Sequence, residues 1–304
     1  MGFESKDSGI AASIFLSLYV IYTALAINIV IKEGWRSVYT TLLIHGIFRV
    51  AGQLCGVAFA ALGWAHWQFL IAYLVFSAEG YFVLILSAYH FIARAQYAVI
   101  GYSWIRPCRE DRKAKVSEAK TFTDRLRARL SLYNVFHYLL IPANSFIISG
   151  GSMLSGLTIE QINGHSGKLV TSRVLRTVGQ SIFLFQTCVA IFLAFRSYFV
   201  EKISHEFIYA VFIVAPFLLV RGVFGILSIY LDKMDYFLLS NYTAEGLASS
   251  FVAYEYIMGT TMEFVSATVF ISTYYINRRL TKKREGDIET FQEDSEEKKV
   301  DETS

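Results

Sequence analysis

The sequence predicts an all-α, polytopic membrane protein with seven transmembrane helices, and three observations support this prediction. The chain of 304 residues is 54% hydrophobic and only 17% charged, unlike an ordinary soluble domain. Its mean hydropathy is positive, at +0.43. Seven separate stretches provide the roughly 20 mostly apolar residues that a helix needs to cross the hydrocarbon core of a bilayer.

The longest connection between the seven predicted spans joins the third and the fourth. They cover about residues 10–32, 38–63, 66–92, 133–155, 174–198, 204–230 and 249–276. All four tryptophans fall at or beyond the ends of these spans, where aromatic belts form: Trp35, Trp64, Trp67 and Trp104. The residues before the first span lack the basic start of a signal peptide, so we expect this span to be a retained helix.

Basic residues predict the orientation of the helices. The connection 93–132 carries ten arginine or lysine residues, and the chain leaves the seventh span as Asn-Arg-Arg-Leu-Thr-Lys-Lys-Arg (277–284). The opposite face offers little beyond Lys6, Lys168, Arg173 and Lys233. Because cytoplasmic connections are enriched in Lys and Arg, we expect the N-terminus outside or in a lumen and the C-terminus in the cytosol. The protein is then expected in the plasma membrane or in an endomembrane of the secretory pathway.

The chain divides into a transmembrane domain over residues 1–280 and a tail over residues 281–304. The tail is acidic and almost free of apolar residues, so we expect it to be disordered. The basic connection 93–132 lies within the transmembrane domain, on the predicted cytosolic side. Both the connection and the tail offer a surface for a cytosolic partner, besides the lipid bilayer itself.

One sequon occurs in the chain, Asn241-Tyr242-Thr243, in the connection between the sixth and seventh spans. This connection is on the predicted lumenal side, which is compatible with N-glycosylation of Asn241. The connection is also short, so the acceptor can lie too near the bilayer to be used.

An arginine in the middle of the second span, Arg49, is the first candidate site residue. A charge at the bilayer centre costs roughly 2.5–3.5 kcal/mol on insertion scales, so it needs a partner, water or a function. Arg49 and Glu79 lie about 14 and about 13 residues from the tight turn at residues 64–66, which places them at nearly the same depth at 1.5 Å per residue. We therefore expect these two residues to pair.

The last two spans repeat this pattern. Arg221 lies in depth between Glu255 and Glu263, and either acid can pair with it. His45 is one helical turn before Arg49. These six residues are predicted to line a ligand or proton pathway: His45, Arg49, Glu79, Arg221, Glu255 and Glu263. Alternatively, the ion pairs only fix which helices meet, and His45 is an ordinary hydrogen-bonded core residue.

The order of these charges also suggests an internal repeat. An arginine followed by a glutamate occurs in spans 2 and 3 and again in spans 6 and 7, although Arg221 lies nearer the outside than Arg49. The repeat would make spans 1–3 and 5–7 two parallel units joined by span 4, in a 3+1+3 arrangement found in transporters. Chance similarity is the competing explanation.

Several functional classes lack their sequence features. The seventh span has no lysine for a retinal Schiff base, and the switch motifs of common G-protein-coupled receptors are missing. No histidine cluster, Gly-rich phosphate loop or Ser/His/Asp set is present, so no metal or other cofactor is expected. Nucleic-acid binding is not expected either, because topology already explains the basic connection.

Several stretches carry a resemblance to a known family. They are FRVAGQ (48–53), AEGYFVLILSAY (78–89), FHYLL (136–140), SGGSML (149–154), PFLLVRGVFGILSIY (216–230) and TTMEFVSATVFI (260–271). Over roughly residues 10–280 the chain resembles an uncharacterised family of fungal seven-helix integral membrane proteins, a domain of unknown function. By position, the family pattern matches Arg49, Glu79, Pro216, Arg221 and Glu263, whereas Tyr254-Glu255-Tyr256 departs from it. The architecture is also similar, more distantly, to fungal lipid-translocating exporters and to membrane-bound terpene cyclases.

Three functions fit these features. The first is a protein that binds, and transports or senses, a small amphipathic molecule at a polar site in the middle of the bundle, with the arginines attracting an anionic or polar head. The second is a seven-helix receptor that signals through the basic connection and the tail. The third is an intramembrane enzyme with Glu79 or Glu263 as general acid. The pairing of the acids with arginines favours the first over the third, because an arginine neighbour makes a carboxyl group a poor acid.

Overall fold

The computed structural model describes residues 3–107, 132–153, 166–236, 238–243 and 246–279, with a few isolated positions between 108 and 131. The acidic tail and much of the basic connection 93–132, between residues 108 and 131, lie outside the described residues. The predictions of a disordered tail and of a basic cytosolic surface are therefore not addressed by the structure.

Seven long helical segments make up the described chain, as predicted. They are α1 (Lys6–Glu33), α2 (Tyr39–Leu62), α3 (Gln68–Ile100), α6 (Leu132–Ser152), α8 (Ser166–Phe199), α9 (Glu206–Tyr230) and a seventh that begins as α10 (Ser249–Tyr254). This seventh helix continues through a π-helical stretch, η4 (Glu255–Thr261), and then as α-helix to residue 279. The only strands in the described residues, β1 (Tyr242–Thr243) and β2 (Gly246–Leu247), form a short antiparallel hairpin.

The surface of this bundle is that of an integral membrane protein. By length and composition, five of the described helices can cross a membrane: α1, α2, α3, α8 and α9. Large apolar side chains are exposed along them, such as Ile21 (60%), Phe185 (63%) and Phe192 (65%). Exposed large apolar side chains along long apolar helices match the lipid-facing side of a membrane bundle.

The predicted span limits are close to the observed helices, and the larger differences have a physical reason. α3 runs to Ile100, beyond its predicted end at residue 92, and stops where Gly101 adopts a left-handed conformation (φ +75°). α8 begins at Ser166, about two turns before its predicted start, and these turns include Lys168 and Arg173. Hydropathy marks only the apolar part of a helix, whereas polar turns extend both helices beyond the hydrocarbon core.

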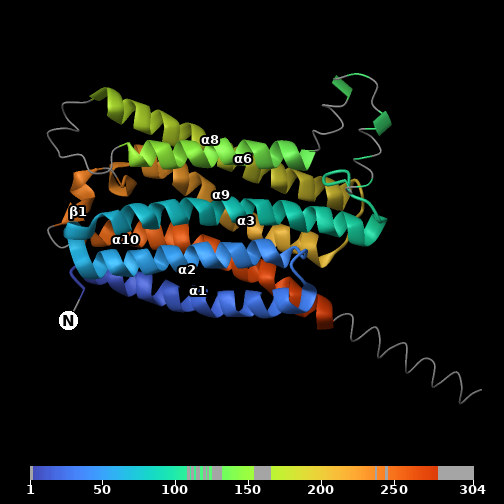
Figure 1. The fold of residues 1–304 in the computed structure, drawn as a ribbon, viewed down its shortest axis with the longest axis horizontal. Coiled ribbons are helices and arrows are strands. Elements are labelled where there is room, and N and C mark those ends of the chain that lie inside the picture. Colours follow the sequence, from blue (N-terminus) through green and yellow to red (C-terminus); the bar gives the residue numbers. More distant parts are fainter. Residues whose placement is uncertain are drawn as a thin grey trace, which may run out of the picture.

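The helices alternate in direction and stack in layers (Figure 1). α6 and α8 form one outer layer, α1 and α2 form the other, and α3, α9 and α10 lie between them. Helices that follow each other in sequence pack together, and α3 also packs against α6, α8 and α9, so it is the central helix of the bundle. The N-terminus and residue 279 lie at opposite ends of the bundle.

We name the two ends of the bundle by their connections. The first end carries the 3₁₀ turn η1 (Gly63–His66) and the connection between α9 and α10, with η2 (Asp232–Met234) and η3 (Leu239–Asn241). The second end carries the turns at residues 34–38 and 200–205. The seven helices and their alternation agree with the predicted arrangement, while the membrane orientation and the 3+1+3 repeat remain predictions.

Candidate functional site

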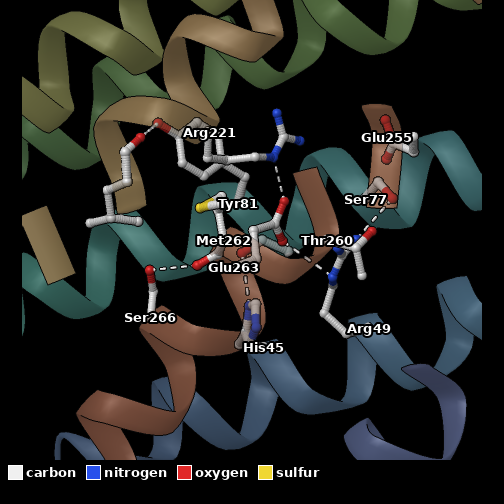
Figure 2. A network of polar contacts seen from close by, with 12 residues as sticks. His45, Arg49, Ser77, Tyr81, Arg221, Glu255, Thr260, Met262, Glu263 and Ser266 are labelled. Atoms are coloured by element: carbon white, nitrogen blue, oxygen red, sulfur yellow. Dashed lines mark hydrogen bonds and ion pairs between the residues drawn. The ribbon is translucent and has the colours of Figure 1, made fainter. Parts of the chain in front are cut away.

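Three charged residues from three helices meet in the middle of the bundle (Figure 2). The carboxylate of Glu263, on the seventh helix, lies between the guanidinium groups of Arg49 on α2 and Arg221 on α9. The Nε of Arg49 is 3.2 Å from Oε2 of Glu263, and the Nε of Arg221 donates to Oε1 at 2.6 Å. All three residues are buried. We call them the central triad.

Arg49 is held on every side by contacts inside the protein. Its Nη1 donates to the hydroxyl of Ser77 on α3 at 2.9 Å, and its Nε also lies 3.4 Å from the hydroxyl of Tyr19 on α1. Its guanidinium group stacks over the Tyr19 ring, 5.4 Å from the centroid. Gly80 provides the space for this side chain, because a Cβ there would lie 2.6 Å from Cδ of Arg49. Arg49 is therefore a fixed part of the core.

Arg221 is placed differently. Its Nε is bonded to Glu263 and its guanidinium group lies over the ring of Tyr81, 4.8 Å from the centroid. The terminal nitrogens point away from Glu263 (Figure 2), and Arg221 lines a cavity. Among the described residues these nitrogens have no hydrogen-bond acceptor. Arg221 therefore joins the central triad through one edge of its guanidinium group and leaves the other edge available.

The charges of the central triad do not cancel. Two guanidinium groups share one carboxylate, so the triad carries a formal excess of one positive charge. Buried ion pairs are stable only when hydrogen bonds satisfy the remaining groups, as Ser77 and Tyr19 do for Arg49. At Arg221 such satisfaction is incomplete within the described chain, so the outer edge of its guanidinium group is the unsatisfied part of the triad.

The predicted pairing of Arg49 with Glu79 is wrong. Arg49 binds Ser77 and Glu263, whereas Glu79 is half-buried and accepts a hydrogen bond from the side-chain amide of Asn144 on α6. The prediction rested only on the similar depth of Arg49 and Glu79 in the membrane. Positions 77 and 79 differ by about 200° around an α-helix, so α3 directs Ser77 toward α2 and Glu79 toward α6. The pairing of Arg221 with Glu263, which was one of the two predicted possibilities, is confirmed.

His45 lies beside the central triad and is fully buried. Its Nδ1 is 3.0 Å from the carbonyl oxygen of Gly80, and its ring packs edge-on against Tyr19 and Tyr22. It makes no ion pair within the described residues. This position agrees with the alternative prediction of a hydrogen-bonded core histidine.

The π-helix η4 determines where the second acid of the seventh helix points. Glu255 is buried, and its Oε1 accepts a hydrogen bond from Tyr73 on α3 at 3.2 Å. In a regular α-helix, residues eight positions apart differ by about 80° in direction. A π-helix turns less per residue, which reduces this difference and brings Glu255 toward the same side of the helix as Glu263. π-Helical stretches are frequent at functional sites.

A cavity of about 110 Å³ adjoins the central triad on the side of the first end. α3, α6, α8 and α9 enclose it, together with Tyr236 and Glu255. Its polar lining includes Arg221, Arg176, Gln180 and Ser77. The side chain of Arg176 donates to Asp235 at 3.2 Å, which ties α8 to the α9–α10 connection beside the cavity. The Oε1 of Gln180 is buried and lacks a hydrogen-bond partner among the described residues.

The structure does not support Asn241 as a glycosylation site. The residue is only 6% exposed, and its side-chain amide donates to the backbone carbonyls of Asp232 and Asp235. A glycan on this nitrogen would require the side chain to leave the connection that it holds together. The neighbouring Tyr242 is half-buried, and burial of its hydroxyl raises the pKa of that group above the usual value.

Several residues of the site were not identified from the sequence. Tyr19, Ser77, Gly80 and Asn144 contact the charged residues directly, and of these residue types Tyr, Ser and Gly are common in apolar helices. Ser77 and Gly80 lie close to Glu79 in the sequence, and Asn144 is a polar amide in an apolar span, so these three carried a sequence signal. Rotation of the helices, which decides these contacts, cannot be calculated from depth.

Comparisons with protein-family models, with curated proteins and with solved structures find no match for this chain. The geometry of the site is therefore the basis for assigning a function.

Proposed function

We propose that this integral membrane protein binds a small amphipathic molecule with an anionic headgroup in the cavity beside Arg221, and that it transports or senses this molecule. The observation that carries the proposal is the position of Arg221. One edge of its guanidinium group is bonded to Glu263, and the other edge lies at a cavity within the membrane-spanning part of the bundle.

The chemistry of the cavity favours an anionic headgroup. A guanidinium group binds carboxylates and phosphates through paired N–H donors. The central triad has two guanidinium groups for one carboxylate, and in a medium of low dielectric constant the charge of Arg221 attracts an anion more strongly than it would in water, although Glu255 on the same cavity partly offsets that charge. Gln180 contributes an acceptor that suits a hydroxyl group on the ligand. The rest of the lining is largely apolar, with side chains such as Leu74, Phe224 and Ile229.

Glu255 lies on the same cavity and gives the site its selectivity. Its carboxyl group opposes negative charge near Arg221, so it limits how tightly an anionic headgroup is held. Transport and sensing both require that the bound headgroup can dissociate. An acid beside the binding arginine lowers the affinity for the headgroup and so allows its release. In the orientation that the basic residues predict, the first end, where the cavity is located, is the outer or lumenal side of the membrane.

A binding measurement tests this proposal. The full chain is reconstituted in phosphatidylcholine nanodiscs, and the binding of fluorescent oleoyl lysophosphatidate is measured by titration. Arg221→Gln is expected to weaken binding by about tenfold or more, because it removes the charged donors. Arg278→Gln, which removes the same charge from an exposed position near the second end, is the control and is expected to bind as the wild type.

Equal affinity of the wild type and a folded Arg221→Gln variant would contradict the proposal. The same labelled lipid separates transport from sensing. In proteoliposomes a transporter moves the label away from a quencher on the outer surface, whereas a sensor only retains it.

A further inference from the structure

The side chains that line the cavity beside Arg221 are more deeply buried on some sides of the cavity than on others. The lining residues from α8, α9 and the seventh helix include Arg176, Arg221, Phe224 and Glu255, all of which are buried. The lining residues from α3 and α6 include five half-buried apolar side chains: Ile71, Leu74, Val75, Ile147 and Ile148. We call these five residues the α3–α6 portal. The cavity is therefore least covered where these two helices face each other.

The contacts between α3 and α6 explain this opening. Toward the second end the helices are joined by Tyr89 with Phe136, by Phe82 with His137, and by Glu79 with Asn144. From Ser145 to Gly151, α6 makes no hydrogen bond, ion pair or ring contact with α3 among the described residues. The hydrogen bond from Asn144 to Glu79 thus marks the inner limit of the opening, near the middle of the membrane.

The dimensions of the opening match one leaflet of a bilayer. From Glu79 to Ile71 the helix α3 rises by about 12 Å. The hydrocarbon part of one leaflet is about 15 Å thick, half of the roughly 30 Å core. The cavity itself, at about 110 Å³, is smaller than the 150 Å³ cavity that holds one benzene molecule in an engineered protein. It has room for a single phosphate or carboxylate group but not for a long acyl chain.

We propose that the ligand is a single-chain lipid whose anionic headgroup enters the cavity at Arg221 while its acyl chain leaves through the α3–α6 portal into the leaflet at the first end. This inference rests on the proposed function and specifies its ligand. The apolar side chains of the portal contact the chain, and Arg221 contacts the carboxylate or phosphate. The bonded pair of Glu79 and Asn144 keeps the two helices together at the midplane and so confines the chain to one leaflet.

The acyl chain provides the test. Binding of oleoyl and hexanoyl lysophosphatidate to the full chain is measured in phosphatidylcholine nanodiscs. Ile147→Trp fills the α3–α6 portal and is expected to weaken oleoyl binding by about tenfold, while hexanoyl binding changes by less than about twofold. Ile141→Trp is the matched control, since Ile141 lies on the same helix, is 46% exposed and does not line the cavity. Leu74→Trp on α3 gives the same test if Ile147→Trp does not fold.

Glycerol 3-phosphate, added as a competitor, distinguishes a membrane lipid from a water-soluble anion with the same head. The inference predicts that it displaces oleoyl lysophosphatidate only weakly. Equal competition by glycerol 3-phosphate would overturn the portal, and so would equal effects of Ile147→Trp on both acyl lengths. If Arg221→Gln weakens both probes but the portal variants do not discriminate between them, the proposed function stands and the portal is wrong. If the wild type binds neither probe, the proposed function itself is wrong.

Discussion

At the scale of single residues, Glu263 is the position on which the centre of the bundle depends. Its carboxylate is completely buried and is the ion-pair partner of both Arg49 and Arg221. Removing one member of a buried ion pair typically destabilises a protein by 3–5 kcal/mol, because an uncompensated charge remains. Here two buried charges would remain, so substitution of Glu263 is expected to be at least as costly as this range.

We therefore predict that Glu263→Gln lowers the free energy of unfolding by about 3–5 kcal/mol. Glu79→Gln is expected to lower it by less than about 1 kcal/mol, since the glutamine oxygen can still accept the hydrogen bond from Asn144. Denaturant unfolding in detergent micelles measures both values.

A pair of double-mutant cycles with Arg49→Gln shows which acid interacts with this arginine. The coupling free energy between Arg49 and Glu263 is expected to exceed about 1 kcal/mol, and the coupling between Arg49 and Glu79 to be near zero. A large coupling to Glu79 and none to Glu263 would restore the pairing that depth suggested and reject the central triad.

The residues of the site were only partly predictable from the sequence. Charged residues in apolar spans are conspicuous, so Arg49, Arg221, Glu255 and Glu263 could be identified as buried before their contacts were known. Counting from a turn gives the depth of a side chain along its helix. The direction in which a side chain points depends on the rotation of its helix about its axis. For Glu79 this rotation directs the side chain to Asn144 on α6 and not to Arg49 on α2.

At the scale of elements, the seventh helix shows why rotation is hard to predict. The stretch Glu-Tyr-Ile-Met-Gly-Thr-Thr carries no proline and only one glycine, yet it forms a π-helix of seven residues. Its altered turn brings Glu255 to the cavity and exposes the carbonyl of Thr260, to which the Tyr19 hydroxyl donates at 3.5 Å. Apolar periodicity assumes 3.6 residues per turn and cannot show this change.

The start of α9 depends on an imidazole group. His205 is the N-cap residue, and its Nδ1 accepts a hydrogen bond from the backbone N–H of Phe207 at 3.2 Å. Only the neutral ring can accept this bond. Burial lowers the pKa of His205, the nearby carboxylate of Glu206 opposes this effect, and Arg94 adds to it. The folded protein therefore binds a proton at His205 less readily than the unfolded chain does.

This difference predicts a loss of stability at low pH. The contribution of neutral His205 is present in full above the unfolded pKa of about 6.5, and it is lost as the pH falls below that value toward the lower pKa of the folded state. His205→Asn keeps a good N-cap residue and removes the titration. Between pH 7 and pH 5, the unfolding midpoint of the wild type is expected to fall more than that of the variant. Parallel curves for the two proteins would exclude this role of His205.

At the scale of the whole molecule, the sequence predicted the helix number and the alternation of the helices but not the relation between the two halves. In the 3+1+3 repeat, Glu79 would correspond to Glu263, and each would bind the arginine of its own half. The structure instead joins both arginines to Glu263 and directs Glu79 to α6. At these charged residues the two halves are not equivalent, because the shared carboxylate lies on the seventh helix alone.

The placement of the cavity at the first end gives the orientation of the molecule functional meaning, and orientation can be measured. Two exposed lysine or arginine positions at opposite ends, Lys233 and Arg36, are replaced singly by cysteine in a chain whose own cysteines are changed to serine. The basic residues predict that position 233 lies on the outer or lumenal side of the membrane. A membrane-impermeant maleimide is then expected to label Lys233→Cys from outside in sealed cells, or in inverted organelles, whose lumenal side faces the solution. Arg36→Cys is expected to be labelled only from the cytosolic side, and the opposite pattern would show that the ligand site faces the cytosol.

The most direct measurement of the central claim combines the charge of Arg221 with the charge of the ligand. The affinities of oleoyl lysophosphatidate and of neutral monooleoylglycerol are determined for the wild type and for Arg221→Gln. If Arg221 binds the headgroup, the preference of the wild type for the anionic lipid falls by about tenfold in the variant, a coupling of about 1.4 kcal/mol. The same preference in both proteins would contradict the account, because Arg221 would then serve only to pair with Glu263.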